Sequence, residues 1–275
     1  SGPRRMQAGA CRDSLIGVRF VDGAGTVIRN GGRVMKNVTG YDLVKLMAGA
    51  YGTLGALTEV AFKVLPAPEA TATLRLHGLS DAGAVAAMTA ALTSPYDVTG
   101  AAHLPRGAEG PETLIRIEGF APSVAYRAGR LKDLLAHRGE AGLELLEGPA
   151  AEAPWPAIRD ARPFADRAGA VWRVSLRPSD APRLLAALPE AEAFLDQGGG
   201  LVWLLTGEGA DAHAPAIREA LAPLGGHATL VRAAPATRAA VAVFEPQPAP
   251  LEAFASGLRS KFDPRGLLNP GRMGA

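Results

Sequence analysis

The sequence predicts an α+β protein in which an antiparallel sheet carries helices on one face. Apolar segments between residues 69 and 245 follow one another in the order strand, helix, strand, strand, helix, strand, and a weaker copy of that order comes after the first. Such an order is typical of ferredoxin-like units. Proline-rich breaks at Pro66–Pro68 and Pro246–Pro250 bound this region, because proline interrupts helices and sheets. We therefore expect three segments, residues 1–68, 69–245 and 246–275.

The first segment is expected to begin with a β-hairpin. Apolar stretches at 15–21 and 26–29 flank the turn-forming residues 22–25. A short helix is expected at 41–50, where apolar residues recur at helical spacing, and a strand at 57–65, where they alternate with polar ones. Between this helix and this strand the chain is rich in glycine.

The middle segment is expected to hold two ferredoxin-like units in succession. The first unit comprises strands at 71–77, 98–103, 113–119 and 143–147 and helices at 81–93 and 123–137. The second comprises strands at 171–176, 200–205 and 227–231 and helices at 181–187 and 212–221. The copies share element order and little sequence, so duplication and a chance similarity both stay open. After the last proline break, residues 251–262 are expected to form an amphipathic helix.

Composition and charge exclude several classes of protein. The 29 basic and 27 acidic residues are spread along the chain, so no basic surface indicates binding to nucleic acid or to a membrane. No stretch approaches the roughly 20 apolar residues of a membrane span, and the start lacks the apolar core of a signal peptide, so we expect a cytoplasmic location. The single cysteine, Cys11, cannot form an internal disulfide or hold an iron–sulfur cluster alone. Any such cluster must lie on a partner.

Three glycines recur at every third position of the loop, at Gly49, Gly52 and Gly55. Backbone N–H groups can approach a phosphate closely where side chains are missing. A helix C-cap followed by a tight turn explains the same spacing, so both interpretations stay open from the glycines alone. The loop follows a helix and enters a strand, which is the reverse of the Rossmann dinucleotide fingerprint.

The run Arg33-Val34-Met35-Lys36-Asn37-Val38-Thr39-Gly40-Tyr41-Asp42-Leu43 precedes this loop at a fixed distance. Together the two resemble the second FAD-binding segment of the vanillyl-alcohol oxidase and p-cresol methylhydroxylase (PCMH) superfamily. Within it, the opening 1–5, Arg12-Asp13, Trp172-Arg173 and the tail 262–273 are most similar to the FAD-binding E subunits of bacterial glycolate oxidases. The resemblance implies the second half of a PCMH-type FAD-binding domain at 1–68, a cap domain at 69–245, and a C-terminal segment at 246–275 that returns to the FAD domain.

The resemblance also implies where FAD would bind. Its pyrophosphate and adenosine would lie along the glycine loop, with Arg12 and Asp13 on the same side and Asn269 brought back by the tail. Lys36, Asn37 and Thr39 either line the cofactor or cap the helix that follows. The expected cofactor-binding residues are thus Arg12, Asp13, Lys36, Asn37, Thr39, Gly49, Gly52, Thr53, Gly55, Leu57 and Asn269.

In the family, a first subdomain with its own glycine-rich loop precedes this segment, and the chain does not begin with methionine. We expect the sequence to be part of a longer chain. Without the opposing subdomain, the resemblance implies that the chain as given binds FAD weakly or not at all and is inactive alone, whereas the full-length protein binds FAD.

Catalytic residues are harder to assign. Related flavoproteins that oxidise hydroxyacids carry a histidine-containing Gly-Asp-Gly-Asn segment for a metal, where this chain has residues 196–203 without histidine. The five histidines are scattered without metal-ligand spacing, so no metal site is expected. Arg173 is a candidate because its planar fork suits a carboxylate, although an arginine that faces outward beside a core residue explains the pattern equally well.

The resemblance implies an FAD-linked oxidoreductase subunit of a glycolate oxidase complex, which supports oxidation of glycolate, a small 2-hydroxyacid, to glyoxylate by hydride transfer to flavin. Its expected partners are a catalytic flavoprotein subunit and an iron–sulfur subunit, through which it would be peripheral to the inner membrane. Whether this subunit oxidises the substrate or only relays electrons stays open. The alternatives are a stand-alone FAD-linked, D-lactate-like 2-hydroxyacid dehydrogenase and a non-catalytic assembly module.

Overall fold

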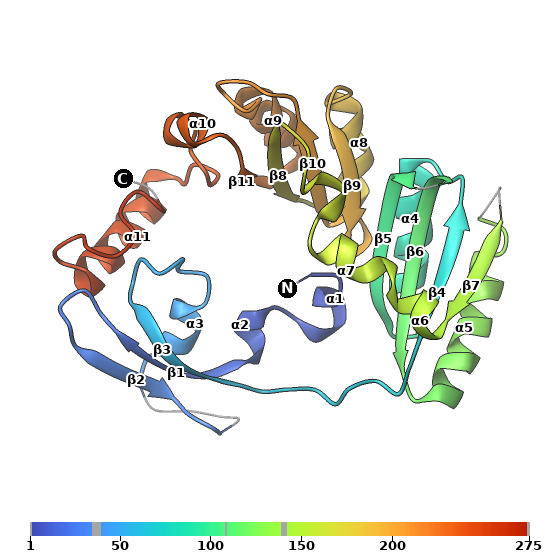
Figure 1. The fold of residues 1–275 in the computed structure, drawn as a ribbon, viewed down its shortest axis with the longest axis horizontal. Coiled ribbons are helices and arrows are strands. Elements are labelled where there is room, and N and C mark those ends of the chain that lie inside the picture. The colour runs from blue at the N-terminus through green and yellow to red at the C-terminus, as the bar shows by residue number, and fades with distance from the viewer. Residues whose placement is uncertain (1, 35–39, 108, 139–141, 274–275) are drawn as a thin grey trace. The chain divides into compact units, whose positions relative to one another are not determined.

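The computed structural model describes residues 2–34, 40–107, 109–138 and 142–273, which fall into two compact units (Figure 1). The large unit consists of the residues up to Ala8 together with 67–245, and the small unit consists of 9–66 together with the residues from Pro246 onward.

An eight-stranded antiparallel sheet forms the large unit, in the order β11-β8-β10-β9-β5-β6-β4-β7. The strands are β4 (Ala70–His77), β5 (Val98–Gly107), β6 (Gly110–Gly119), β7 (Leu143–Glu147), β8 (Ala170–Ser175), β9 (Glu192–Asp196), β10 (Leu201–Thr206) and β11 (His227–Arg232). The first four have the spatial order β7-β4-β6-β5, and the last four have the equivalent order β11-β8-β10-β9. The predicted α+β class and the duplication of a ferredoxin-like unit are therefore confirmed.

The two copies join where β5 pairs with β9, at His103 opposite Leu195. Strand β9 is missing from the sequence prediction, which passed from the helix at 181–187 directly to the strand at 200–205. Its five residues contain only two large apolar side chains, Phe194 and Leu195, and so short a run shows no alternation. The strand is formed by its pairing with β10, which extends from Glu192 to Asp196.

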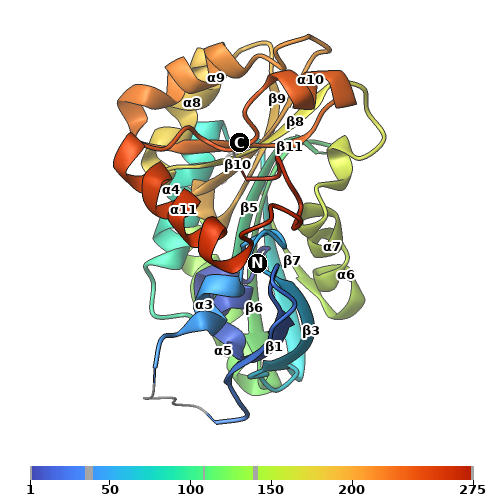
Figure 2. The ribbon, with the colours of Figure 1, turned by 90° about the vertical axis from the view of Figure 1, so that its left-hand side faces the viewer.

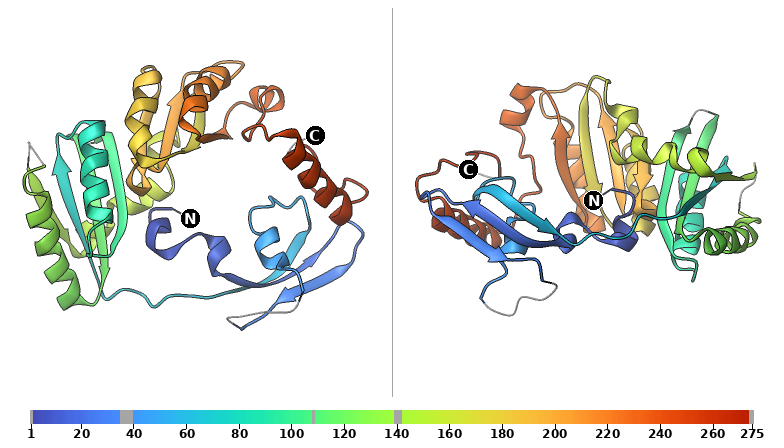
Figure 3. Two further views of the ribbon diagram at one scale, coloured as in Figure 1. Left: turned by 180° about the vertical axis from the view of Figure 1, so that it is seen from behind. Right: turned by 60° about the horizontal axis from the view of Figure 1, so that its bottom comes forward.

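Four helices cover one face of this sheet: α4 (Asp81–Leu92), α5 (Ala121–Leu135), α8 (Ala181–Ala187) and α9 (Ala214–Leu221). In the left view of Figure 3, α4, α5 and α8 (teal, green and gold) lie in front of the strands. The main core lies between helices and sheet, and it includes Leu74, Met88, Leu131 and Trp172. The indole of Trp172 donates a hydrogen bond to the carbonyl of Ala212, at 2.9 Å, so its polar atom is satisfied inside the core.

The opposite face of the sheet carries a further layer that the sequence analysis did not include. Residues 148–164 form α6 (Gly148–Glu152), α7 (Pro154–Arg159) and the 3₁₀ helix η1 (Arg162–Phe164). These place Trp155, Ile158 and Phe164 in a second core cluster with sheet residues such as Phe194. Figure 2 shows α6 and α7 on the other side of the sheet from α4 and α8. The connection crosses this face because it must lead from β7, at one edge of the sheet, to β8, next to the other edge.

Residues 2–8 group with the large unit, whereas we expected them in the first segment. Helix α1 (Arg5–Ala8) packs beside β5, and Arg4 forms an ion pair with Glu118 on β6. At the other end of the unit, α10 (Pro235–Ala240) follows β11, whose Leu230 N–H donates to the carbonyl of Val243, at 2.8 Å. Further 3₁₀ turns are η2 (Pro178–Asp180), η3 (Gln197–Gly199) and η4 (Ala222–Leu224).

The small unit contains a three-stranded antiparallel sheet in the order β2-β1-β3. Its elements are α2 (Cys11–Ser14), β1 (Leu15–Val21), β2 (Val27–Gly31), α3 (Leu43–Met47), β3 (Ala56–Phe62) and α11 (Ala249–Phe262). The predicted hairpin is present. Its turn is held by the Asp22 carboxylate, which accepts hydrogen bonds from the backbone N–H groups of Ala24 and Thr26 at 3.0 and 2.8 Å.

Seven buried apolar residues form the core of the small unit: Leu15, Val18, Phe20, Val44, Met47, Ala50 and Leu54. Helix α11 returns to this core through Phe262, whose ring centroid lies 6.1 Å from that of Phe20. No helix in the described part of the chain is long and apolar enough to cross a membrane.

Candidate functional site

The glycine loop leaves helix α3 through a series of left-handed backbone conformations. The φ angles are +91° at Gly49, +52° at Tyr51 and +72° at Gly52. The loop closes on itself where Thr53 donates to the Ala50 carbonyl with its backbone N–H at 3.0 Å and with its hydroxyl at 2.7 Å. Gly49, Tyr51 and Gly52 are exposed, whereas Thr53 and Gly55 are buried. Only the first half of the loop can therefore touch a ligand directly.

Two of the three loop glycines lie closely against other residues of the small unit. A Cβ atom at Gly55 would lie 2.6 Å from Cδ2 of Phe20, and one at Gly52 would lie 2.6 Å from Nδ2 of Asn269. At Gly49, no atom lies within 4 Å of the position that a Cβ would take. The exposed backbone of Gly49 therefore leaves room for close approach by a phosphate group, and in this respect the loop fits the pyrophosphate of FAD.

Two other predicted cofactor residues, Arg12 and Asp13, have structural partners. Asp13 caps α2 by accepting from the Ala10 N–H at 2.7 Å, and Nε of the exposed Arg12 donates to the Lys45 carbonyl at 3.2 Å. Leu57 is 47% exposed on β3. Lys36, Asn37 and Thr39 lie outside the described residues. The N-cap of α3 is Asp42, which accepts from the Lys45 N–H at 3.1 Å.

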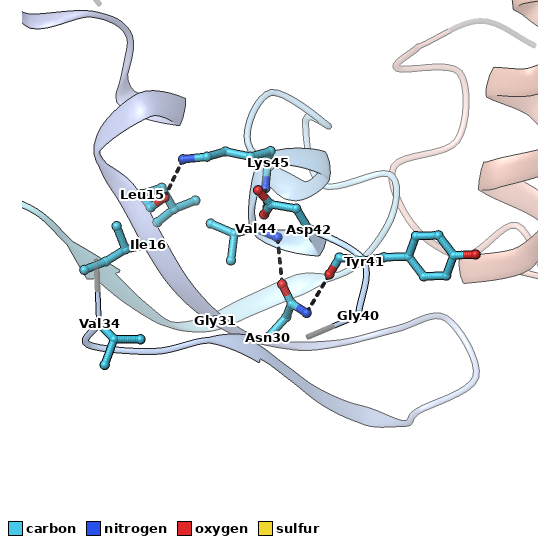
Figure 4. Close-up of a pocket in the computed structure, with 10 residues that line it drawn as sticks. All are labelled: Leu15, Ile16, Asn30, Gly31, Val34, Gly40, Tyr41, Asp42, Val44 and Lys45. Carbon is cyan, nitrogen blue, oxygen red and sulfur yellow. Dashed lines mark hydrogen bonds between the residues drawn. The ribbon is translucent and has the colours of Figure 1, made fainter. Parts of the chain in front are cut away.

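A cavity of about 220 Å³ lies between β1, β2 and α3 (Figure 4). Asn30 spans it, accepting from the Val44 N–H at 3.2 Å and donating to the Tyr41 carbonyl at 2.9 Å. Lys45 donates through Nζ to the carbonyls of Arg12 and Leu15, at 2.5 and 2.8 Å. These side chains hold α3 against the sheet. Neither role was expected from the sequence, because the position of a polar residue at a strand end or on a helix does not indicate which backbone group it will bond.

In the large unit, Arg173 lies on the sheet face opposite the four helices. Its neighbours in sequence, Trp172 and Val174, point into the main core, so Arg173 points the other way. It is half-buried between Trp203 of β10 and Thr229 of β11. Within the described ranges, its guanidinium forms no hydrogen bond or ion pair, although its charge acts on Asp196. The N–H groups of this half-buried guanidinium are therefore available to an anion.

A buried acid lies on the same sheet face. Asp196 is 1% exposed and accepts from the Gln197 N–H at 2.7 Å. Burial raises the pKa of Asp196 to about 6, although the Gln197 hydrogen bond and the positive charges of Arg116 and Arg173 oppose the shift. Sequence analysis included Asp196 only as part of the segment without histidine. Its carboxyl is too buried to touch a ligand, but it sets the electrostatic surroundings of both arginines.

Arg116 of β6 is the third charged group on this face, and it is 6% exposed. Its Nε donates to the hydroxyl of Thr99 at 3.1 Å, and its Nη2 donates to the carbonyl of Thr99 at 3.0 Å. The guanidinium also forms an ion pair with Glu118 at 3.3 Å and lies over the ring of Trp155, 4.4 Å from its centroid. Burial lowers the pKa of Arg116, and the charge of Glu118 opposes that shift. Its position inside the apolar run Leu114-Ile115-Arg116-Ile117 is the sequence feature that could have indicated a buried arginine.

A cavity of about 590 Å³ opens beside Arg116 and lies entirely within the large unit. Sheet residues, the connecting helices and the first residues of the chain line it, among them Arg4, Arg116, Glu118, Glu152 and Trp155. Arginines and glutamates nearly balance there, so the cavity is polar without being strongly cationic. Among the described residues, no group of three or more histidine, cysteine or acidic side chains is placed to hold a metal ion.

Comparisons with known proteins cover both units. No family model matches the chain. The glycolate oxidase subunit GlcE of Escherichia coli is 38% identical over 276 residues, which span 99% of this chain and 69% of that protein. The glycolate oxidase subunit GlcD of Bacillus subtilis is 45% identical over 73 residues, 26% of this chain and 16% of that protein. A D-lactate dehydrogenase of Anaerostipes hadrus is 38% identical over 73 residues, 26% of this chain and 15% of that protein.

The fold is also found in a solved structure. An alkyldihydroxyacetonephosphate synthase superimposes with a TM-score of 0.62 at 15% identity, over 99% of this chain and 57% of the synthase chain. Identity this low indicates a shared fold and carries no information on substrate.

Proposed function

The chain belongs to the family of the glycolate oxidase subunit GlcE, and on that premise we propose that it is an FAD-binding subunit of a glycolate oxidase complex that supports oxidation of glycolate to glyoxylate. The observation that carries this proposal is the extent of the similarity, which runs through 99% of the chain and thus through both units. The D-lactate dehydrogenase match covers 26% of the chain. A stand-alone dehydrogenase is therefore the less favoured reading.

We propose that FAD is held by the small unit at the exposed half of the glycine loop. The supporting features are the open backbone of Gly49, the exposed backbone of Gly52, and the exposed guanidinium of Arg12, whose Nε donates to the carbonyl of Lys45 in the helix before the loop. When bound, FAD supplies the hydride acceptor of the reaction. The contribution of these residues is to bind and orient the cofactor. The full-length protein is expected to carry flavin absorbance after purification, and a colourless preparation that does not take up added FAD would contradict the proposal.

We propose that Arg173 binds the carboxylate of the hydroxyacid. A guanidinium can donate two parallel N–H bonds to a carboxylate, and the guanidinium of Arg173 has no competing hydrogen bond or ion pair among the residues that the structure describes. Arg116, by contrast, is committed to Thr99 and Glu118. The role of Arg173 in this proposal is to bind and orient the substrate.

The test of Arg173 is its replacement by glutamine in the purified complex. Loss of a charged hydrogen bond of about 1.5–3 kcal/mol is expected to lower kcat/KM for glycolate about 10- to 100-fold. Arg177→Gln is the matched control, because Arg177 is exposed and already pairs with Asp180 at 2.8 Å. If both variants oxidise glycolate at the parental rate, the substrate is bound on another subunit and this chain supports the reaction without touching it.

The proposed partners are a catalytic flavoprotein subunit and an iron–sulfur subunit. The chain has one cysteine, Cys11, so it cannot supply the thiolates of a cluster by itself. Affinity purification of the tagged full-length protein from its own cells is expected to recover both partners. Glycolate oxidation by the subunit purified alone would instead favour the stand-alone enzyme.

A further inference from the structure

The C-terminal tail contacts three successive residues of the glycine loop. Asn269 donates through Nδ2 to the carbonyl of Tyr51 at 2.9 Å, and its amide occupies the space that a side chain at Gly52 would need. The hydroxyl of Thr53 lies 3.9 Å from the sulfur of Met273. The guanidinium of Arg272 lies 5.7 Å from the centroid of the Tyr51 ring. All of these residues belong to the small unit.

The tail is itself fixed to the small unit, so it can act as a support. The carboxylate of Asp263 accepts from the Leu268 N–H at 2.6 Å, and this bond, with those of neighbouring backbone N–H groups, holds the pKa of Asp263 below its ordinary value. Arg265 donates to the carbonyl of Gly23 in the hairpin turn at 3.2 Å. Asn269 has a φ of +46°, a conformation that asparagine tolerates better than most residues.

The loop peptide that Asn269 contacts needs such a support. Tyr51 has a φ of +52°, and the left-handed region is strained for a residue with a side chain. Gly52, which follows, can adopt either sign of φ with little penalty. The peptide between Tyr51 and Gly52 could therefore turn over without a steric barrier from a side chain at Gly52.

We propose that Asn269 is a positioning residue that orients the Tyr51–Gly52 peptide for phosphate binding. In a trans peptide the C=O and N–H groups point to opposite sides. Because Asn269 holds the Tyr51 oxygen toward the tail, the Gly52 N–H points away from the tail, where an anion can accept it. A turned peptide would present the Tyr51 oxygen to the phosphate and repel it. This inference rests on the proposed FAD site, and it assigns to Asn269 a role through the loop and not through direct contact with the cofactor.

The test compares variants of the full-length protein by titrating FAD into the apoprotein and following flavin fluorescence. Asn269→Gly keeps the left-handed conformation and removes the donor, and it is expected to raise the FAD dissociation constant about tenfold, the loss of one charge-assisted hydrogen bond. Asn269→Asp also lacks the donor and adds a negative charge, so it is expected to raise the FAD dissociation constant further than Asn269→Gly does. The difference between the two variants should become smaller as salt is added, because salt screens the added charge. Arg265→Gln is the matched control, since it releases a different tail contact.

The melting temperature of each apoprotein separates positioning from simple support of the fold. The expected result is that Asn269→Gly and Arg265→Gln melt at similar temperatures while only Asn269→Gly loses affinity for FAD. If affinity follows the melting temperature in both variants, or if Asn269→Gly binds FAD like the parent, the inference is overturned while the FAD site stands. If the parent protein binds no FAD, the proposed function itself fails.

Discussion

The two units of the chain differ in how completely they bury their own apolar surface. Nineteen large apolar side chains are exposed among the described residues; thirteen of them lie in the small unit and six in the large one, although the large unit is the longer. The sheet of the large unit has an apolar layer on each face. The sheet of the small unit exposes Leu57, Val60 and Phe62 along β3.

The difference shows that the units depend on different interactions. The large unit is stabilised mainly by two apolar clusters, one on each face of its sheet. The small unit has a core of seven residues, and polar side chains such as Asn30, Lys45 and Asn269 determine where its helix, loop and tail lie. The small unit is thus expected to be the less stable of the two.

The largest expected effect on stability comes from replacing a large buried side chain in either core by alanine. Phe20→Ala in the small unit and Leu74→Ala in the large unit, both fully buried, should each lower the free energy of unfolding of their own unit by roughly 3–5 kcal/mol. Amide hydrogen exchange is expected to rise across β1–β3 in the first variant and across β4–β7 in the second. Faster exchange in both units after either substitution would show that the two units unfold together and do not differ in stability.

The second effect concerns the buried acid of the large unit. Burial raises the pKa of Asp196 from its ordinary 3.8 to about 6. The folded state therefore binds the Asp196 proton more tightly than the unfolded state does. The stability that protonated Asp196 contributes is fully present below the ordinary pKa and is lost as the pH rises through about 6. The total loss is about 3 kcal/mol of unfolding free energy.

Asp196→Asn keeps an oxygen for the Gln197 N–H and removes the charge. Urea unfolding should show the variant more stable than the parent at pH 8, by up to about 3 kcal/mol, with the difference gone near pH 4. A difference that does not change with pH would show that Asp196 is not buried as a charged group. Asp180→Asn serves as the control, because this buried acid already pairs with Arg177 and Arg183.

The smallest expected effect concerns two paired valines in the sheet of the small unit. Val18 and Val60 face each other across β1 and β3, but Val18 is 6% exposed and Val60 is 45% exposed. Val18→Ala should cost about 1–2 kcal/mol of unfolding free energy, whereas Val60→Ala should stay within about 0.5 kcal/mol. Chemical denaturation measures both. An equal cost for Val60→Ala in the full-length protein would show that another part of that protein covers β3.

Local patterns predicted most elements correctly. The hairpin at 15–29, the helices of both ferredoxin-like copies and the amphipathic helix at 251–262 lie within a few residues of their predicted places. They were predictable because the period of apolar residues reports which face of a single element is buried. The run before the glycine loop and the tail motif at 262–273 indicated the family, which the comparison over 99% of the chain then established.

Tertiary structure alone decided the features that join distant residues. Strand β9 exists because β10 pairs with it, the connection at 148–164 crosses the second sheet face because the strand order requires it, and Asn269 reaches Tyr51 across 218 positions of sequence. The sequence by itself therefore determined most of the elements and the family. Which side chains meet, including Arg116 with Trp155 and Asn269 with the loop, depended on long-range packing and hydrogen bonding, which leave no periodic trace in the chain.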